Sequence, residues 1–376
     1  MFQRSIEAIL REAILQSNKI VILYGPRQVG KTTLVRNVLG TLPFTSLEVN
    51  ADQTKYHEVL ASRDLAKMKE LIGVAELLFI DEAQNIPNIG INLKILHDNL
   101  PNLRIIATGS SSFELANQLK EPLTGRTLTL RLYPIALQEL ALHLSPFELK
   151  DQLENFMLYG MYPEVRTLEG SRRKINHLRE LADSYLYKDV LQLSNIRHAD
   201  KIVKLLKLLA FQTGSLVSLH ELGKSLEMSH ETVNNYIDLL EKGFILFRLN
   251  GFSRNLRKEV NKMNRVYFYD TGIRNMLIEN FNPLSLRHDT GGLWENFLLS
   301  ERIKKMEYQQ IWGSRYFWRT YSGAELDYVE ERDGQLYGFE FKWKASKPKP
   351  PATWLDTYPN ASYQMVNRDN LLDFVL

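Results

Sequence analysis

The chain has 376 residues, with 47 lysines and arginines against 44 aspartates and glutamates, and no cysteine. This length predicts more than one folded domain, and the lack of cysteine excludes disulfides and thiolate metal sites. A net charge of +3 excludes a global field for nucleic acid, so contacts with nucleic acid must come from local clusters. No uncharged apolar run approaches the length of a membrane span, and the charged, amphipathic start is not a signal peptide. We therefore expect a cytoplasmic protein without membrane contact.

Residues 20–24 are apolar throughout and lead into a glycine-bounded loop, as in a buried strand followed by a phosphate-binding turn. The loop has P-loop spacing, in which glycines let backbone N–H groups surround a polyphosphate at a helix start. We expect Lys31 to reach the β and γ phosphates of ATP and the Thr32 hydroxyl to hold Mg²⁺. The predicted ATP-binding residues are Gly25, Pro26, Arg27, Gln28, Val29, Gly30, Lys31, Thr32 and Thr33.

Further apolar runs, separated by helical patterns, predict a doubly wound parallel α/β sheet. These runs are residues 44–49, 77–80, 103–107 and 128–132. Asp81 and Glu82 follow one of them, at the sheet edge where ligands of such folds collect. We expect Asp81 to bind Mg²⁺ and Glu82 to polarise the attacking water. Thr108, after the next run, is expected to sense the γ phosphate or hold the water, with capping of a strand or helix as the alternative.

A resemblance to a known family depends on five short segments: Gly-Pro-Arg-Gln-Val-Gly-Lys-Thr-Thr, Ile-Asp-Glu-Ala-Gln, Ala-Thr-Gly-Ser-Ser, Leu-Thr-Gly-Arg-Thr and Leu-Tyr-Pro-Ile. They resemble the prokaryotic AAA+-type ATPases that carry a fused C-terminal domain of unknown function. The resemblance implies that Arg126 lies near the nucleotide of the same or a neighbouring subunit, as an arginine finger in a homo-oligomer. A solvated or salt-bridged Arg126 is the alternative. Residues 159–164 resemble the family's Gly-Gly-Tyr-Pro-Glu lid motif, with Met161 in place of the second glycine.

The pattern after residue 140 predicts a helical lid and then a helix-turn-helix, in which Ser218 and Ser229 cap the two helices. Two wing strands would complete a winged helix. The exposed face of its second helix carries acids, which favours packing over sequence-specific reading of DNA. A basic wing could instead follow a phosphate backbone; its residues are Arg248, Arg254, Arg257, Lys258, Lys262 and Arg265. Residues 270–272 resemble the family's junction motif, and by themselves indicate a turn or a helix cap.

Asp333-Gly334 is a hairpin signal that places Asp327 opposite Glu340 and Glu325 opposite Lys342. Opposed carboxylates repel unless a cation neutralises them. An acid on one strand, Glu-x-Lys on the next and an acid on a preceding helix resemble the PD-(D/E)XK nucleases. The resemblance implies that Asp327, Glu340 and Glu295 hold Mg²⁺ and that Lys342 steadies the reacting phosphate. The alternatives are a polar hairpin face with a Glu325–Lys342 salt bridge, or a nuclease-like fold without activity.

The sequence therefore predicts an α/β protein with four parts: a P-loop AAA+-type ATPase core (1–140), a helical lid (141–200), a winged helix (201–284) and a nuclease-like domain (285–376). The first hypothesis is a Mg²⁺-dependent ATPase that acts on nucleic acid, with metal-dependent cleavage by the C-terminal domain. The alternative is an ATP-gated protein-interaction switch whose nuclease-like domain is inactive. A transcription regulator is disfavoured by the acidic recognition helix.

Overall fold

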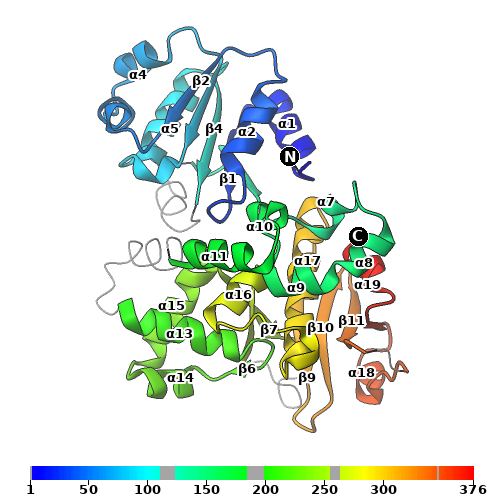
Figure 1. The fold of residues 1–376 in the computed structure, drawn as a ribbon. Helices are drawn as coiled ribbons and strands as arrows, with labels where there is room; N and C mark the ends of the chain where they lie inside the picture. Colours follow the sequence, from blue (N-terminus) through cyan, green and yellow to red (C-terminus); the bar gives the residue numbers. More distant parts are fainter. Residues whose placement is uncertain (1, 111–122, 184–198, 255–262, 345–346) are drawn as a thin grey trace. The chain divides into compact units, whose positions relative to one another are not determined.

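The computed structural model describes residues 2–110, 123–183, 199–254, 263–344 and 347–376 (Figure 1). The chain forms two compact units. Unit 1 comprises Met1–Pro134 with Lys242–Phe244, and unit 2 comprises Ile135–Glu241 with Ile245–Leu376. The division into four domains that the sequence predicts remains a prediction. Within the described residues, no helix combines the length and the apolar composition needed to cross a membrane.

Unit 1 is built on a parallel sheet with strand order β2-β3-β4-β1-β5. Its strands are β1 (Ile20–Tyr24), β2 (Ser46–Asn50), β3 (Leu77–Asp81), β4 (Arg104–Gly109) and β5 (Thr127–Arg131). Its helices are α1 (Glu7–Gln16), α2 (Lys31–Leu39), α3 (His57–Leu60), α4 (Leu65–Ile72) and α5 (Ile89–Asn99), with short turns η1 (Thr54–Tyr56) and η2 (Ala83–Asn85). Strands β1 and β3 are buried at every position. Figure 1 shows α1 and α2 on one side of the sheet and α5 on the other. The predicted parallel α/β sheet is confirmed.

Unit 2 contains a mixed sheet with strand order β12-β11-β10-β9-β7-β8-β6. Its strands are β6 (Leu216–Val217), β7 (Leu246–Gly251), β8 (Asn264–Phe268), β9 (Ser314–Arg319), β10 (Glu325–Arg332), β11 (Gln335–Phe341) and β12 (Ser362–Val366). Strand β7 pairs in parallel with β9, where Asn250 faces Tyr316 and Gly251 faces Phe317. The segments that the sequence assigns to a winged helix and to a nuclease-like domain therefore share one sheet.

The helices of unit 2 surround this sheet (Figure 1). They are α7 (Leu137–Leu140), α8 (Pro146–Asp151), α9 (Leu153–Tyr159), α10 (Pro163–Thr167), α11 (Ser171–Leu181), α13 (Ala199–Phe211), α14 (Leu219–Leu226), α15 (His230–Lys242), α16 (Thr271–Leu277), α17 (Thr290–Tyr308), α18 (Ala352–Thr357) and α19 (Leu371–Val375), with a short turn η4 (Leu284–Leu286). Ser218 accepts a hydrogen bond from the Glu221 N–H, and Ser229 accepts one from the Thr232 N–H, so both predicted helix caps are confirmed. The winged-helix interpretation of α14, α15 and strands β6 to β8 stays a prediction.

The hairpin β10–β11 has the predicted turn and register. Tyr328 faces Phe339 and Arg332 faces Gln335 across the two strands. Asp333 and Gly334 have φ values of +50° and +75°, which a two-residue turn of this twist requires at both positions. A local sequence signal therefore sets which residues of the two strands lie opposite each other.

The junction motif and the lid motif, more than 100 residues apart in sequence, are joined through Asp270. Its Oδ1 accepts a hydrogen bond of 3.0 Å from the Ile273 N–H and so caps α16, while its Oδ2 accepts one of 2.6 Å from the Met161 N–H. Asn275 adds bonds to the carbonyls of Met157 and Leu158 at the end of α9. The helix-cap interpretation of residues 270–272 is confirmed, and the same carboxylate also fixes the lid motif.

Candidate functional site

The loop between β1 and α2 has the backbone that a phosphate cradle needs. Gly30 is left-handed, with φ +95°, at the point where α2 begins. At Gly25 a Cβ atom would lie 2.1 Å from the Leu132 carbonyl oxygen, so only glycine fits there. Between the two glycines, Pro26 and Val29 are buried, whereas Arg27 and Gln28 are exposed. The predicted P-loop residues therefore form a tight turn at the amino end of a helix.

The Lys31 side chain is buried inside this loop. Its Nζ donates to the carbonyl oxygens of Gly25 and Pro26, at 2.9 and 3.1 Å, and lies 3.7 Å from a carboxylate oxygen of Glu82. Burial lowers the pKa of Lys31, although the carboxylates of Glu82 and Asp81 oppose this effect. The ammonium group is held mainly by neutral carbonyls, an arrangement suited to an incoming anion.

Two hydroxyl groups converge on the Asp81 carboxylate at the carboxyl edge of the sheet. Thr32 Oγ1, at the start of α2, donates to both carboxylate oxygens, at 3.0 and 2.8 Å, and Thr108 Oγ1, on β4, donates to one at 2.5 Å. Because β3 and β4 are neighbouring parallel strands, Asp81 and Thr108 end at the same edge. A hydroxyl and a carboxylate are ligand types that Mg²⁺ accepts beside phosphate oxygens. The structure thus brings together three residues predicted from separate motifs, and their donor set fits the ion.

Glu82 follows in a strained left-handed backbone conformation, with φ +53°. Its N–H donates to Thr108 Oγ1, at 3.1 Å, and its Oε2 accepts from Gln84 Nε2, at 2.6 Å. Burial acts to raise the pKa of Glu82, but the charge of Lys31 and the hydrogen bond from Gln84 outweigh it, so the pKa lies below its usual value. The carboxylate is therefore held ionised next to Lys31.

Sequence reasoning missed Gln84 and Arg4. Gln84 is buried, also donates to Ser110 Oγ at 3.2 Å, and has an Oε1 without a partner in the described structure. Its signal was its place in the segment Ile-Asp-Glu-Ala-Gln. Arg4 donates to the Val29 carbonyl in the P-loop, at 2.7 Å, and to the Tyr133 carbonyl, at 2.6 Å. No local pattern marks a contact between residues so far apart in the chain.

Arg126 lies at the opposite edge of the same sheet. It directly precedes β5, and its carbonyl accepts from the Ile20 N–H, where β1 begins. Its guanidinium forms two hydrogen bonds with the Asp98 carboxylate at the end of α5, at 2.8 and 3.1 Å. Arg126 is thus salt-bridged and distant from the P-loop of its own chain, and a role at the nucleotide of a neighbouring subunit stays a prediction.

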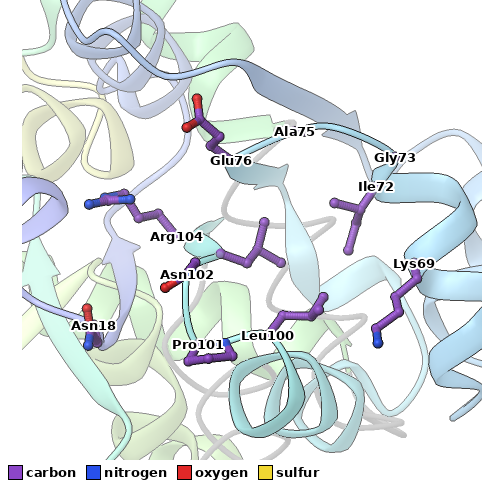
Figure 2. Close-up of a pocket in the computed structure, with 11 residues that line it drawn as sticks. Asn18, Lys69, Ile72, Gly73, Ala75, Glu76, Leu100, Pro101, Asn102 and Arg104 are labelled. Atoms are coloured by element: carbon purple, nitrogen blue, oxygen red, sulfur yellow. The ribbon is translucent and has the colours of Figure 1, made fainter.

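A hollow of about 640 Å³ also opens at this opposite edge, near the amino ends of β3 and β4. Figure 2 shows Ile72 and Leu100 on its walls, with Lys69 and Asn102 among the residues around it. The Arg104 side chain at its margin packs its guanidinium over the Phe44 ring. None of the predicted site residues lines this hollow, so it is separate from the P-loop site.

In unit 2, Arg265 lies among the acids predicted to bind metal. From β8, its guanidinium is 3.1 Å from Glu295 on α17, 3.1 Å from Glu325 and 3.5 Å from Asp327, both on β10. Tyr267 also donates a hydrogen bond to Glu295. Burial and the nearby Asp327 raise the pKa of Glu295 to about 8. A fixed guanidinium, rather than an acid-only cage, therefore faces these carboxylates.

The other residues of the predicted nuclease site are paired separately. Glu340 interacts with Lys342, at 2.8 Å, and accepts a hydrogen bond from Tyr363, at 2.5 Å. Lys342 thus pairs with Glu340 rather than with Glu325. Within the described ranges, no group of three or more acidic or histidine side chains could hold a metal ion. Asp327 and Glu295 instead contact Arg265, and Glu340 contacts Lys342; a metal-binding role for these three acids stays a prediction.

The described residues of the basic wing form ion pairs with acids of the protein. Arg248 pairs with Asp238 and Glu241, both at 2.5 Å, on α15. Arg254 pairs with Glu331, at 2.6 Å, and Arg265 is buried in the cluster above. The remaining predicted wing residues lie outside the described residues: Arg257, Lys258 and Lys262. Arg248 and Arg265 thus form ion pairs within the protein, and contact between the wing and a phosphate backbone stays a prediction.

Comparison with known families divides the chain into three regions. Residues 17–141 match the AAA domain family. Residues 150–284 and 290–372 match two domains of unknown function, DUF8612 and DUF4143. The first match covers the P-loop, Asp81, Glu82 and Thr108, the residues that the geometry brings together.

Similar proteins extend along most of the chain. An uncharacterized protein of Mycobacterium tuberculosis is 29% identical over 344 residues, which span 90% of this chain and 74% of that protein. An uncharacterized protein of Methanocaldococcus jannaschii is 26% identical over 314 residues, 77% of this chain and 68% of that protein. Among solved structures, a Walker-type ATPase of Pyrococcus abyssi has a similar fold, with a TM-score of 0.51, 16% identity, and coverage of 74% of this chain and 96% of that one. The family match and this fold support an ATPase of the prokaryotic AAA type.

Proposed function

We propose that unit 1 hydrolyses ATP with the help of Mg²⁺ and that its nucleotide cycle controls what unit 2 binds. The observation that carries the ATPase is the convergence of Thr32 and Thr108 on Asp81, with Lys31 and Glu82 beside them at the loop. This set contains a phosphate-binding cation, oxygen ligands and a carboxylate base, which are the parts that phosphoryl transfer to water needs.

Each residue then has one task. Lys31 leaves the loop carbonyls for the β and γ phosphates, and the N–H groups of the loop surround the same phosphates. Thr32 and Asp81 would hold Mg²⁺, which neutralises charge on the phosphate oxygens when bound. Glu82 accepts a proton from the attacking water, and Thr108 orients the backbone of Glu82 through its N–H bond. Arg126 reaches the nucleotide of a neighbouring subunit in a homo-oligomer.

The test measures ATP binding and phosphate release separately, with Mg²⁺ and with EDTA. We expect Lys31→Ala to lose ATP binding, and Glu82→Gln to bind ATP but to release phosphate at least 100-fold more slowly. Lys19→Ala and Glu70→Gln, at exposed positions of the same unit, are matched controls and should behave as wild type. Normal turnover in Glu82→Gln would assign the base elsewhere, and turnover unaffected by EDTA would exclude the metal.

For unit 2 we infer recognition of a partner rather than cleavage. The supporting observation is Arg265, whose guanidinium lies within 3.5 Å of both Glu295 and Asp327, where a divalent ion would otherwise bind. This supports an ATP-gated switch with an inactive nuclease-like domain over a metal-dependent nuclease. Incubation of assorted DNA and RNA with the protein, Mg²⁺ or Mn²⁺, and with or without ATP should leave the strands intact. Cleavage that is lost in Lys342→Ala, with ATPase activity retained, would reverse this preference.

A further inference from the structure

A basic hollow of about 520 Å³ lies in unit 2. It is lined by Lys150, Leu153, Trp343, Lys344, Arg368 and Asp369. These residues come from the end of α8 and start of α9, the segment after β11, and the turn between β12 and α19. Three separate parts of the unit thus build one concave surface, whose volume is within the range of small-ligand sites.

The Trp343 ring forms part of this surface and packs against a second tryptophan. Trp343 is partly exposed, and its ring meets the fully buried Trp294 edge-to-face, with centroids 5.3 Å apart. The guanidinium of Arg368 lies over the Trp343 ring, 4.8 Å from its centroid. The exposed guanidinium of Arg368, held over this ring, presents a planar surface on which a nucleic-acid base can stack.

The lining of the hollow is positively charged, and its cations are not paired with carboxylates of the described residues. Lys150 Nζ donates to the backbone carbonyl of Asp369, at 2.6 Å, a neutral acceptor. Within the described structure, neither Lys150, Lys344 nor Arg368 forms an ion pair with a carboxylate. Three cations therefore face one acid, Asp369, in the lining. This contrasts with Arg248 and Arg265 of the predicted wing, whose charges are paired.

We propose that this hollow binds single-stranded nucleic acid. A base stacks against Trp343 and Arg368, and Lys150 and Lys344 contact the adjoining phosphates. The concave shape accepts an unpaired base, whereas the bases of a duplex are stacked on one another and cannot reach the ring. The binding deepens the proposed partner recognition by unit 2 and rests on that role, but it is independent of the ATPase reaction in unit 1.

The experiment measures fluorescence anisotropy of labelled 15-mer poly(dT), 15-mer poly(U) and a 15-base-pair DNA duplex with the full chain, both without nucleotide and with ATP and Mg²⁺, at 50 to 200 mM NaCl. Wild type should bind the single strands more tightly than the duplex. Arg368→Ala and Trp343→Ala should weaken single-strand binding by about 5- to 150-fold, and Trp343→Phe should retain most of it. Lys344→Ala should lower the slope of log affinity against log salt by about 0.7.

Trp312→Ala and Lys224→Ala, exposed in unit 2, are matched controls and should bind as wild type. Arg368 is exposed, so its variant tests the site even if Trp343→Ala fails to fold. No binding by wild type at 50 mM NaCl in either nucleotide state would overturn the proposal, as would unchanged affinity in Arg368→Ala or equal binding of duplex and single strands. ATP binding and phosphate release are measured in their own assays, so these outcomes are separate from a failure of the ATPase assignment.

Discussion

Replacement of Arg265 by methionine tests whether this side chain takes the place of a metal ion in unit 2. Arg265 is buried and contacts three carboxylates within 3.5 Å. Methionine has a similar length but no charge, so the variant leaves these carboxylates without their cation. The expected result is a large loss in the free energy of unfolding of unit 2.

The magnitude follows from the burial of each partner. The Glu325 side chain is 45% exposed, so its contact contributes at most about 1 kcal/mol. The side chains of Glu295 and Asp327 are only 13% and 16% exposed, and breaking such a buried pair costs about 3–5 kcal/mol above pH 8, where Glu295 is ionised. A loss of about 4 kcal/mol is a large part of the stability of an ordinary domain. Replacing both partners, in Arg265→Met with Glu295→Leu, should recover about half of this loss, since no buried charge then faces an apolar side chain at that contact.

The assay is urea unfolding followed by tryptophan fluorescence. All five tryptophans of the chain, residues 294, 312, 318, 343 and 354, belong to unit 2, so the signal reports on this unit alone. Mn²⁺ should raise the unfolding midpoint of Arg265→Met and leave that of wild type unchanged, because only the variant lacks the guanidinium that contacts these carboxylates. A variant as stable as wild type, or a wild type stabilised by Mn²⁺, would refute the reasoning.

Three further predictions concern the hydrogen bonds of Gln84, Arg4 and Asp270. Gln84→Ala removes a hydrogen bond that lowers the pKa of Glu82, so this pKa should rise. Because the base must be ionised, kcat in a pH–rate profile should begin to fall at a higher pH than in wild type as the solution is acidified. An unshifted profile would contradict this role of Gln84. Arg4→Met removes the bonds to Val29 and Tyr133, so ATP affinity should fall by about 10-fold, measured with a fluorescent ATP analogue; unchanged affinity would mean that the loop holds its shape alone. Asp270→Ala leaves two N–H groups without acceptors. The free energy of unfolding of unit 2 should fall by about 2–4 kcal/mol in the same urea assay. A loss below about 0.5 kcal/mol would show that water replaces the carboxylate.

The parts that the sequence predicted well depend on short-range signals. The P-loop is a run of consecutive residues, and the Asp333-Gly334 turn by itself sets the register of β10 and β11. The sequence predicts the position of Asp81 because a buried strand places it at the carboxyl edge of the sheet, where ligands of such folds bind. These features need no knowledge of distant parts of the chain.

Contacts between distant residues could not be predicted in the same way. Arg265 was assigned to a basic wing because its neighbours in sequence are basic, yet its partners lie 30 to 62 residues away on α17 and β10. Arg248 belongs to the same basic run, yet it pairs with Asp238 and Glu241 on α15. Charge counted along the chain says little about a charge that folding pairs elsewhere.

The pairing of β7 with β9 limits where this chain can be divided into separate fragments. Separation near residue 285 would strip β7 of its neighbour and leave the row of amide and carbonyl groups along it unmatched, which invites association with other chains. Fragments made at that boundary should therefore aggregate, and the segments on either side of it need to be expressed together to fold.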